Sequence, residues 1–131
     1  MKNESAISHK PQRPFSVKAR LRSFGYAFEG INAFFQSQHN AIIHLVLTIA
    51  AIAAGIFFNI SRVEMLAIVI ASGCVWAAEL FNTAIERLAD VLSKEHHPDI
   101  KFVKDISAAA VLLTAVAACI TAAIIFIPKL S

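Results

Sequence analysis

Two uncharged apolar stretches dominate the pattern of hydrophobic and polar positions along the chain. Residues 41–58 form a stretch of 18 residues without a formal charge, and residues 106–127 form one of 22 residues. At a rise of about 1.5 Å per residue, a helix of either length crosses most or all of a hydrocarbon core about 30 Å thick. The pattern therefore predicts transmembrane helices over about 41–58 and about 106–127.

A third apolar stretch lies between these two and carries polar side chains at its C-terminal end. Residues 65–78 are apolar and continue into the segment ELFNTAIERLAD, which ends at Asp90. The apolar part alone is short for a membrane span, and it becomes long enough only if the helix continues past Glu79 and Asn82. We therefore expect a transmembrane helix over about 65–89, with ionisable groups at membrane depth.

The N-terminal region has a different pattern. Residues 1–14 are polar and contain two prolines, which predicts a flexible tail. Over about 15–37, apolar side chains recur at spacings of three and four, as in an amphipathic helix. The apolar stripe comprises Val17, Leu21, Phe24, Phe28, Ile31 and Phe35. Basic residues beside the stripe favour a helix on the cytoplasmic membrane surface. Docking on a soluble protein and folding onto the bundle are the alternatives.

Together these elements predict an all-α membrane protein, with an N-terminal amphipathic surface helix and three transmembrane helices in one domain over 15–131. Hydrophobic residues make up 57% of the chain and charged residues 16%, against about 45–50% and about 25% in typical soluble domains. A chain of 131 residues has little interior in which to bury so much apolar surface. The composition therefore disfavours both a soluble globular domain and a disordered chain.

The positions of Lys and Arg predict the orientation in the membrane. Six lie in the first forty residues, one in the loop 59–64, four in residues 87–104 and one in the C-terminal tail. The positive-inside rule then places the N-terminus and the second loop in the cytoplasm. The net charge of +3 does not predict nucleic-acid binding, because most basic residues flank the apolar stretches. Both cysteines lie within apolar stretches, so we expect buried small side chains and no disulfide or metal site.

The polar side chains of the second span share one face of its helix. Glu79, Asn82, Glu86 and Asp90 are spaced by three, four and four residues, which aligns them in a stripe. Carboxylates at membrane depth are costly, so they tend to face the bundle interior or water and to carry function. Beyond the following loop, a Lys-Asp pair begins the third span. The stripe therefore marks a candidate functional site near the cytoplasmic end of the bundle.

Several functions are compatible with such a stripe. In a membrane-surface enzyme, one carboxylate could take a proton from a lipid hydroxyl, others could hold Mg²⁺, and a Lys could neutralise phosphate charge. A small proton-coupled transporter that uses Glu79 and Glu86 is the alternative function. Ion pairs that only hold helices or subunits together are a third interpretation. The sequence contains no Walker A loop and no kinase-type Gly-rich loop, so an ordinary soluble nucleotide-binding fold is not expected.

The segment ELFNTAIERLAD, followed by KDISAAAV, resembles the prokaryotic diacylglycerol kinase family of small integral-membrane lipid kinases. The resemblance runs from about Phe24 to the C-terminus, and the segments HHP and IIFIPKL are closer to its undecaprenol kinase branch. It implies Mg²⁺-dependent transfer of the ATP γ-phosphate to the primary hydroxyl of a lipid alcohol, undecaprenol or diacylglycerol. It also implies a homotrimer in the bacterial cell (inner) membrane, with sites shared between neighbouring subunits.

The same resemblance assigns roles to residues by motif position. Glu79 matches the catalytic base that faces the lipid substrate, and Asn82 matches a polar residue needed at the active site. Glu86 matches the carboxylate that binds ATP through its metal ion. The other residues that match the nucleotide pocket are Tyr26, Asp90, Glu95, His97, Lys104 and Asp105, with Lys104 on phosphate.

One position departs from the family pattern. The family usually carries a Glu two residues before an Asn in the first-span region, as a second metal ligand. This chain has Gln38 before Asn40, and a Gln carbonyl can ligate Mg²⁺ but adds no charge. We therefore expect Gln38 to be a weaker metal ligand beside Glu86. His44 completes the NxxxH pattern of the undecaprenol-type members and is expected to face the bundle. A histidine that only packs between helices is the alternative.

Overall fold

The computed structural model describes residues 16–92 and 97–130, and these residues form four α-helices and no strand. The helices are α1 (Val17–Ser37), α2 (His39–Phe57), α3 (Arg62–Leu92) and α4 (Pro98–Leu130). This confirms the predicted all-α class, whereas the tail predicted over 1–14 lies outside the described residues. The chain divides into two compact units, Met1–Asn32 and Ala33–Ser131, and each is described by itself. A single domain over 15–131 stays a prediction.

The described part of the first unit is the N-terminal portion of α1. The helix begins after Ser16, whose Oγ accepts a hydrogen bond of 3.3 Å from the N–H of Ala19, as an N-cap serine does. The predicted apolar stripe is exposed along this portion, with Leu21 at 66% and Phe28 at 69%. The amphipathic helix is therefore confirmed, and its position on the membrane surface remains a prediction.

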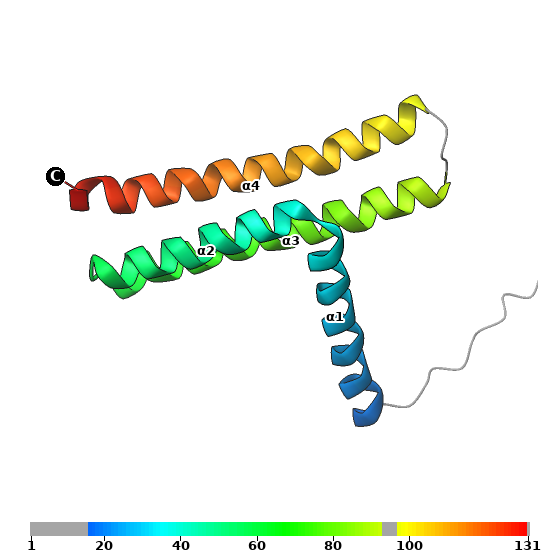
Figure 1. Ribbon diagram of the computed structural model, residues 1–131, viewed down its shortest axis with the longest axis horizontal. Coiled ribbons are helices and arrows are strands. Elements are labelled where there is room, and N and C mark those ends of the chain that lie inside the picture. The colour runs from blue at the N-terminus through cyan, green and yellow to red at the C-terminus, as the bar shows by residue number, and fades with distance from the viewer. Residues whose placement is uncertain (1–15, 93–96, 131) are drawn as a thin grey trace, which may run out of the picture. The chain divides into compact units, whose positions relative to one another are not determined.

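The second unit contains the helices that are candidates to span a membrane. Within the described residues, α2, α3 and α4 are long and apolar enough to cross a membrane, which confirms three transmembrane candidates. Figure 1 shows these three helices side by side, with successive helices running in opposite directions. The N-terminal end of α2, the C-terminal end of α3 and the N-terminal end of α4 therefore point towards the same end of the bundle, where α3 and α4 extend beyond α2. The polar stripe of α3 is on this half of the bundle.

The last helix is longer than the apolar stretch that predicts it. α4 begins at Pro98, whereas the uncharged stretch begins at Ile106. A proline at the first helical position is favourable, because its fixed backbone angle suits the helix and its missing N–H has no intrahelical acceptor. Charged side chains do not end the helix, so Lys104 and Asp105 lie inside α4 and not at its beginning.

A short connection joins α2 to α3. Asn59 adopts the left-handed conformation, with φ of 56°, and the N–H of Ile60 donates to the C=O of Gly55 over 3.1 Å. These features form a Schellman-type helix end, in which Asn can take the position usually held by Gly. Ser61 and Glu64 then form a reciprocal capping box at the start of α3, with hydrogen bonds of 2.6 and 3.2 Å. The local sequence therefore fixes the antiparallel turn.

Aromatic and polar contacts join the helices of the second unit. The ring of Trp76 lies 6.2 Å from that of Phe34 and 5.6 Å from that of Phe35. Its indole Nε1 donates to Thr48 Oγ1 on α2 over 3.2 Å. Such interhelical hydrogen bonds help to hold helices together where lipid removes the usual hydrophobic driving force. α2 and α3 are therefore held in a defined register beside the polar stripe.

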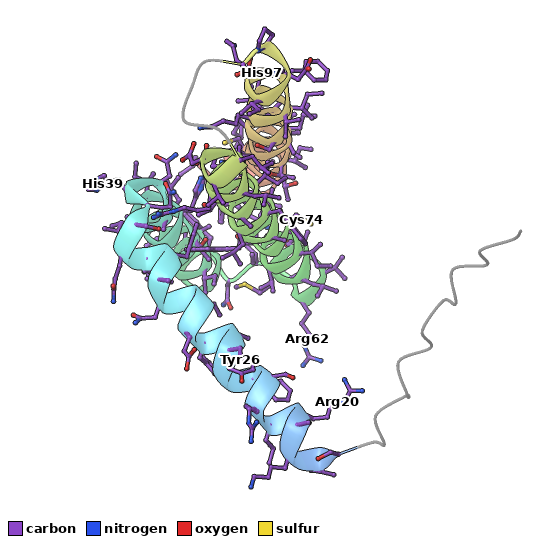
Figure 2. All side chains as sticks on the ribbon, turned by 90° about the vertical axis from the view of Figure 1, so that its right-hand side faces the viewer. Arg20, Tyr26, His39, Arg62, Cys74 and His97 are labelled. Atoms are coloured by element: carbon purple, nitrogen blue, oxygen red, sulfur yellow. The ribbon has the colours of Figure 1, made fainter. Side chains whose placement is uncertain are left out.

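The protein core of one chain is small. The buried apolar side chains are Phe34, Ala41, Ile68, Val75, Ala89 and Ile125. Many large apolar side chains of the spanning helices are exposed on the single chain, as expected of helices that face lipid or other chains. The prediction of buried cysteines is wrong for the single chain, because Cys74 and Cys119 are both exposed. Figure 2 shows Cys74 on the outside of α3.

Candidate functional site

Glu79 is a buried carboxylate within a helix that is long and apolar enough to span a membrane. It lies on α3 with an exposed fraction of only 4%, and its Oε1 is 3.0 Å from Nε2 of His44 on α2. Burial of a carboxylate is costly unless it is hydrogen-bonded or paired. The contact also confirms that His44 faces the bundle. The predicted base therefore has a specific polar neighbour on another helix.

Asn82 and Glu86 form the middle of the polar stripe. Asn82 Nδ2 donates to Glu86 Oε1 over 3.2 Å, and Asn82 Oδ1 accepts a hydrogen bond of 2.6 Å from Ser107 Oγ on α4. The Ser107 hydroxyl oxygen also lies 2.9 Å from the C=O of Lys104. The two contacts of the amide fix its orientation, because its oxygen accepts while its nitrogen donates. Asn82 therefore links α4 to the carboxylate of Glu86.

Asp90 and Lys104 form an ion pair at the end of the stripe. Lys104 Nζ lies 2.8 Å from Asp90 Oδ1, which connects α4 to α3. Both side chains are partly exposed, at 37% for Lys104 and 62% for Asp90. Exposed ion pairs contribute little to stability, so this Lys remains available to bind an anion. The stripe thus runs from a buried carboxylate to an exposed one that is paired with a cation of α4.

Sequence reasoning missed two hydroxyl groups beside this stripe. Ser107 is 6% exposed and contacts Asn82. Its signal was its polarity within the stretch 106–127, which is otherwise almost entirely apolar. Thr83 Oγ1 is buried and has no hydrogen-bond partner among the described residues. The signal of Thr83 in the sequence was weaker. A Thr in a helix can direct its hydroxyl to a backbone C=O of the preceding turn, so its presence alone does not indicate a site.

In the described part of the second unit, neither Asp105 nor His97 forms a hydrogen bond or an ion pair with the stripe. Asp105 is exposed and pairs with Lys101 within α4. His97 stands at the start of α4 (Figure 2), where its Nδ1 accepts a hydrogen bond of 3.3 Å from the N–H of Asp99. Tyr26 is exposed on α1 and belongs to the first unit. Glu95 lies outside the described residues. For these four residues, nucleotide binding stays a prediction.

Gln38 lies between α1 and α2 and is partly exposed. Its backbone N–H donates to Phe34 C=O over 3.0 Å, and its C=O accepts from the N–H of Ala41 over 3.2 Å. Its side chain makes no capping hydrogen bond to α2, and in the described part of the chain no hydrogen bond joins it to Glu86. The amide group is therefore not committed to the helix start.

The donor atoms around Glu86 are compatible with Mg²⁺. Carboxylate and amide oxygens are hard ligands, and Mg²⁺ is usually bound through one or two carboxylates together with substrate phosphates and water. Among residues 16–92 and 97–130, no three His, Cys, Asp or Glu side chains lie close enough to hold a metal ion. A Mg²⁺ ion at Glu86 would therefore need phosphate oxygens, water or further ligands to complete its coordination.

An apolar cavity of about 360 Å³ lies among α2, α3 and α4. Small side chains such as Ala51, Ala71 and Ala118 line it, and His44 contributes one of its few polar groups. The histidine thus connects this cavity with the polar stripe.

The sequence profile of the prokaryotic diacylglycerol kinase family matches residues 25–126, which is most of the chain. The chain belongs to this family. The matched range includes all three spanning helices almost completely, together with the whole polar stripe. The family resemblance seen in the motifs is therefore confirmed.

Three relatives are similar to this chain over most of its length. An undecaprenol kinase from Bacillus subtilis is 36% identical over 110 residues, which cover 84% of this chain and 89% of the relative. A diacylglycerol kinase from Synechocystis is 34% identical over 84% of this chain and 63% of the relative. A diacylglycerol kinase from Pseudomonas aeruginosa is 30% identical over 72% and 76%, respectively. The chain is therefore a membrane lipid kinase, and the transporter alternative is not supported.

The contact of Ser107 with Asn82 leads to a first prediction for this kinase. Ser107→Ala should lower kcat for lipid phosphorylation about tenfold, because it leaves the half-buried Asn82 Oδ1 without its donor, at a cost of about 1–3 kcal/mol. The measurement is kcat of the purified protein in lipid micelles. Thr114→Ala is the matched control, since the Thr114 hydroxyl bonds only to backbone C=O groups of its own helix. An unchanged kcat in Ser107→Ala would show that this hydrogen bond is unimportant for catalysis.

Proposed function

We propose that the protein transfers the γ-phosphate of ATP to the primary hydroxyl of undecaprenol or diacylglycerol, with Mg²⁺ as cofactor. The observation that carries this proposal is the stripe on α3, where the buried Glu79 is followed by Asn82, Glu86 and Asp90 towards one end of the bundle. A base at membrane depth can meet a lipid hydroxyl, while charged groups nearer the water can meet a nucleotide. Phosphoryl transfer depends mainly on such positioning and on charge neutralisation.

Glu79 would act as the general base. Its carboxylate accepts the proton of the lipid hydroxyl while the hydroxyl oxygen forms its bond to the γ-phosphorus. The bond from that phosphorus to the β,γ-bridging oxygen breaks in line, and ADP leaves. The low exposure of Glu79 keeps water, the competing nucleophile, away from the base.

Glu86 would be the main metal ligand, with Gln38 as a neutral second ligand. Mg²⁺ bound there would neutralise charge on the β- and γ-phosphates during transfer. Asn82 holds the Glu86 carboxylate through its Nδ2–H. Lys104 would move from Asp90 to the phosphates, where its charge stabilises the transition state. The nucleotide pocket would be completed by five further residues, which are Tyr26, Asp90, Glu95, His97 and Asp105.

We also propose that the protein acts as a homotrimer in the bacterial inner membrane, with its N-terminus in the cytoplasm. Two observations support shared sites. The described residues of one chain do not bring three metal-ligating side chains together, and large apolar faces of its spanning helices are exposed. A neighbouring copy could cover such faces and supply the missing ligands. The Lys and Arg distribution supports the orientation.

Phosphate transfer by the purified protein tests the proposed function. ATP labelled at the γ-phosphate is offered in mixed micelles with diacylglycerol or undecaprenol, with Mg²⁺ or with a chelator. We expect a labelled lipid only when Mg²⁺ is present, and the faster acceptor identifies the substrate. ATP labelled at the α-phosphate is the control and should label neither lipid. Absence of labelled lipid from a folded, oligomeric protein would contradict the proposal.

A further inference from the structure

We propose that His44 is a positioning residue that donates a hydrogen bond from Nε2–H to Glu79 and holds its carboxylate in the orientation needed to accept the substrate proton. The inference rests on the proposed function, in which Glu79 is the base. The sequence placed His44 within a motif pattern but left it without a role beyond facing the bundle. The structure supplies the missing element, because it brings this side chain from α2 to the base on α3.

The contact has the geometry and burial of a functional hydrogen bond. Nε2 and Oε1 are 3.0 Å apart, and the exposed fractions of the two side chains are 19% for His44 and 5% for Glu79. An ionised carboxylate accepts hydrogen bonds and cannot donate them. The imidazole nitrogen that faces Glu79 must therefore carry the proton whenever Glu79 is in its basic, ionised form.

A second contact keeps His44 in register with Glu79. Thr48 lies one turn after His44 on α2, and its Oγ1 donates to the C=O of His44 over 2.7 Å. The same oxygen accepts the Nε1–H of Trp76, which lies three residues before Glu79 on α3. Two polar contacts one helical turn apart thus join the antiparallel helices. This pair of contacts restrains sliding of α2 along α3, so His44 stays opposite the carboxylate.

The hydrogen bond has a direct consequence for proton transfer. A carboxylate has two oxygens, so a donor that holds Oε1 leaves the other oxygen to meet the lipid hydroxyl. Without that donor, the side chain of Glu79 could rotate between several orientations, of which only some point at the substrate. Loss of the donor should therefore reduce kcat more than it changes KM, because the nucleotide is bound by other residues of the stripe.

Two substitutions of His44 separate positioning from packing. His44→Leu fills a similar volume without a donor, whereas the side-chain amide of His44→Gln can place an N–H near the former Nε2. We expect His44→Leu to lower kcat about 30-fold, with KM for ATP changed less than about threefold, and His44→Gln to recover most of kcat. Leu47→Ala is the matched control, since Leu47 is on the same helix and lines the same cavity but offers no polar group. Its kcat should stay within about threefold of wild type.

The kinetic outcomes have distinct meanings. A wild-type protein that phosphorylates neither lipid overturns the proposed function and this inference with it. An active wild type whose His44→Leu variant keeps its kcat overturns the positioning role alone. Equal losses in His44→Leu and His44→Gln also overturn it, because a donor at this position would then be irrelevant. A loss of kcat in His44→Leu together with recovery of most of kcat in His44→Gln supports the positioning role. If His44→Leu fails to assemble, His44→Asn replaces it, since an amide one carbon shorter falls short of the carboxylate.

A spectroscopic measurement tests the same contact independently of enzymatic activity. In wild-type protein with ¹⁵N-labelled histidine, Nε2 of His44 should have the NMR shift of a protonated nitrogen, assigned by its loss in His44→Gln. Glu79→Leu removes the acceptor and should shift that resonance. An unchanged resonance in Glu79→Leu would show that the hydrogen bond is absent in the membrane-embedded protein, and would overturn the inference.

Discussion

Glu79→Gln should lower phosphate transfer to the lipid by about 10²–10⁴-fold, which is the usual contribution of a general base. Gln has nearly the same shape as Glu, and its carbonyl oxygen can still accept a hydrogen bond from His44. It cannot accept the substrate proton under assay conditions. The change therefore removes the proposed chemistry while it keeps the packing. The measurement is kcat with saturating ATP and lipid.

Two further variants make this result specific. Glu64→Gln neutralises a carboxylate near the opposite end of α3, where Glu64 contacts Ser61 and Lys129, and should leave kcat near the wild-type value. Glu79→Asp keeps a base but withdraws it by one methylene, so its kcat should lie between those of wild type and Glu79→Gln. Binding of ATP should be similar in all these proteins. Full turnover by Glu79→Gln would show that another group takes the proton.

The sequence pattern was sufficient to predict the elements of the fold. Uncharged length predicted α2 and most of α4, because in lipid a span must be a continuous helix that satisfies its own backbone. The same rule required α3 to continue through the polar residues after Ala78, and it does. The start of α4 at Pro98 was not predicted, since membrane hydropathy marks the apolar part of a helix and not its charged first turns.

The stripe on α3 could also be predicted, but the contacts that define the site could not. A period of 3.6 residues is enough to place Glu79 and Glu86 on one face of a helix. It does not determine which residues of α2 and α4 lie opposite that face, because the register between helices depends on side-chain packing along their whole length. For this reason the contact of Ser107 with Asn82 was missed, and the pairing of His44 with Glu79 was not anticipated.

Residues outside α3 and α4 were the hardest to assign. Gln38 lies where α1 gives way to α2, and Tyr26 belongs to a different unit from the stripe. A match in motif position carries no information on how such segments fold against the bundle or against a neighbouring copy. These residues therefore need functional tests. Gln38 offers the more informative test, because Gln38→Glu introduces the negative charge that the family usually carries at this position.

Glu86→Gln should lower kcat/KM for Mg-ATP by about 100-fold or more, since even the loss of a hydrogen-bonded neighbour of a metal ligand costs about 10–100-fold. The substituted side chain keeps an oxygen that can accept the Nδ2–H of Asn82, so the polar network on α3 survives. What is lost is the negative charge that attracts Mg²⁺. A titration of activity against Mg²⁺ at fixed ATP should therefore show both a lower maximum and a midpoint at higher Mg²⁺.

Gln38→Glu should have the opposite effect on the same titration. A second carboxylate near the metal adds charge to a hard-oxygen site, so the midpoint should move to several-fold lower Mg²⁺. If Gln38 and Glu86 bind one ion, Gln38→Glu should also restore part of the activity of Glu86→Gln. Glu64→Gln is the control for charge alone and should leave the midpoint unchanged.

If the midpoint does not move in either Glu86→Gln or Gln38→Glu, the metal is held elsewhere. If each variant moves it but Gln38→Glu restores nothing to Glu86→Gln, the two positions do not share an ion within the assembled kinase.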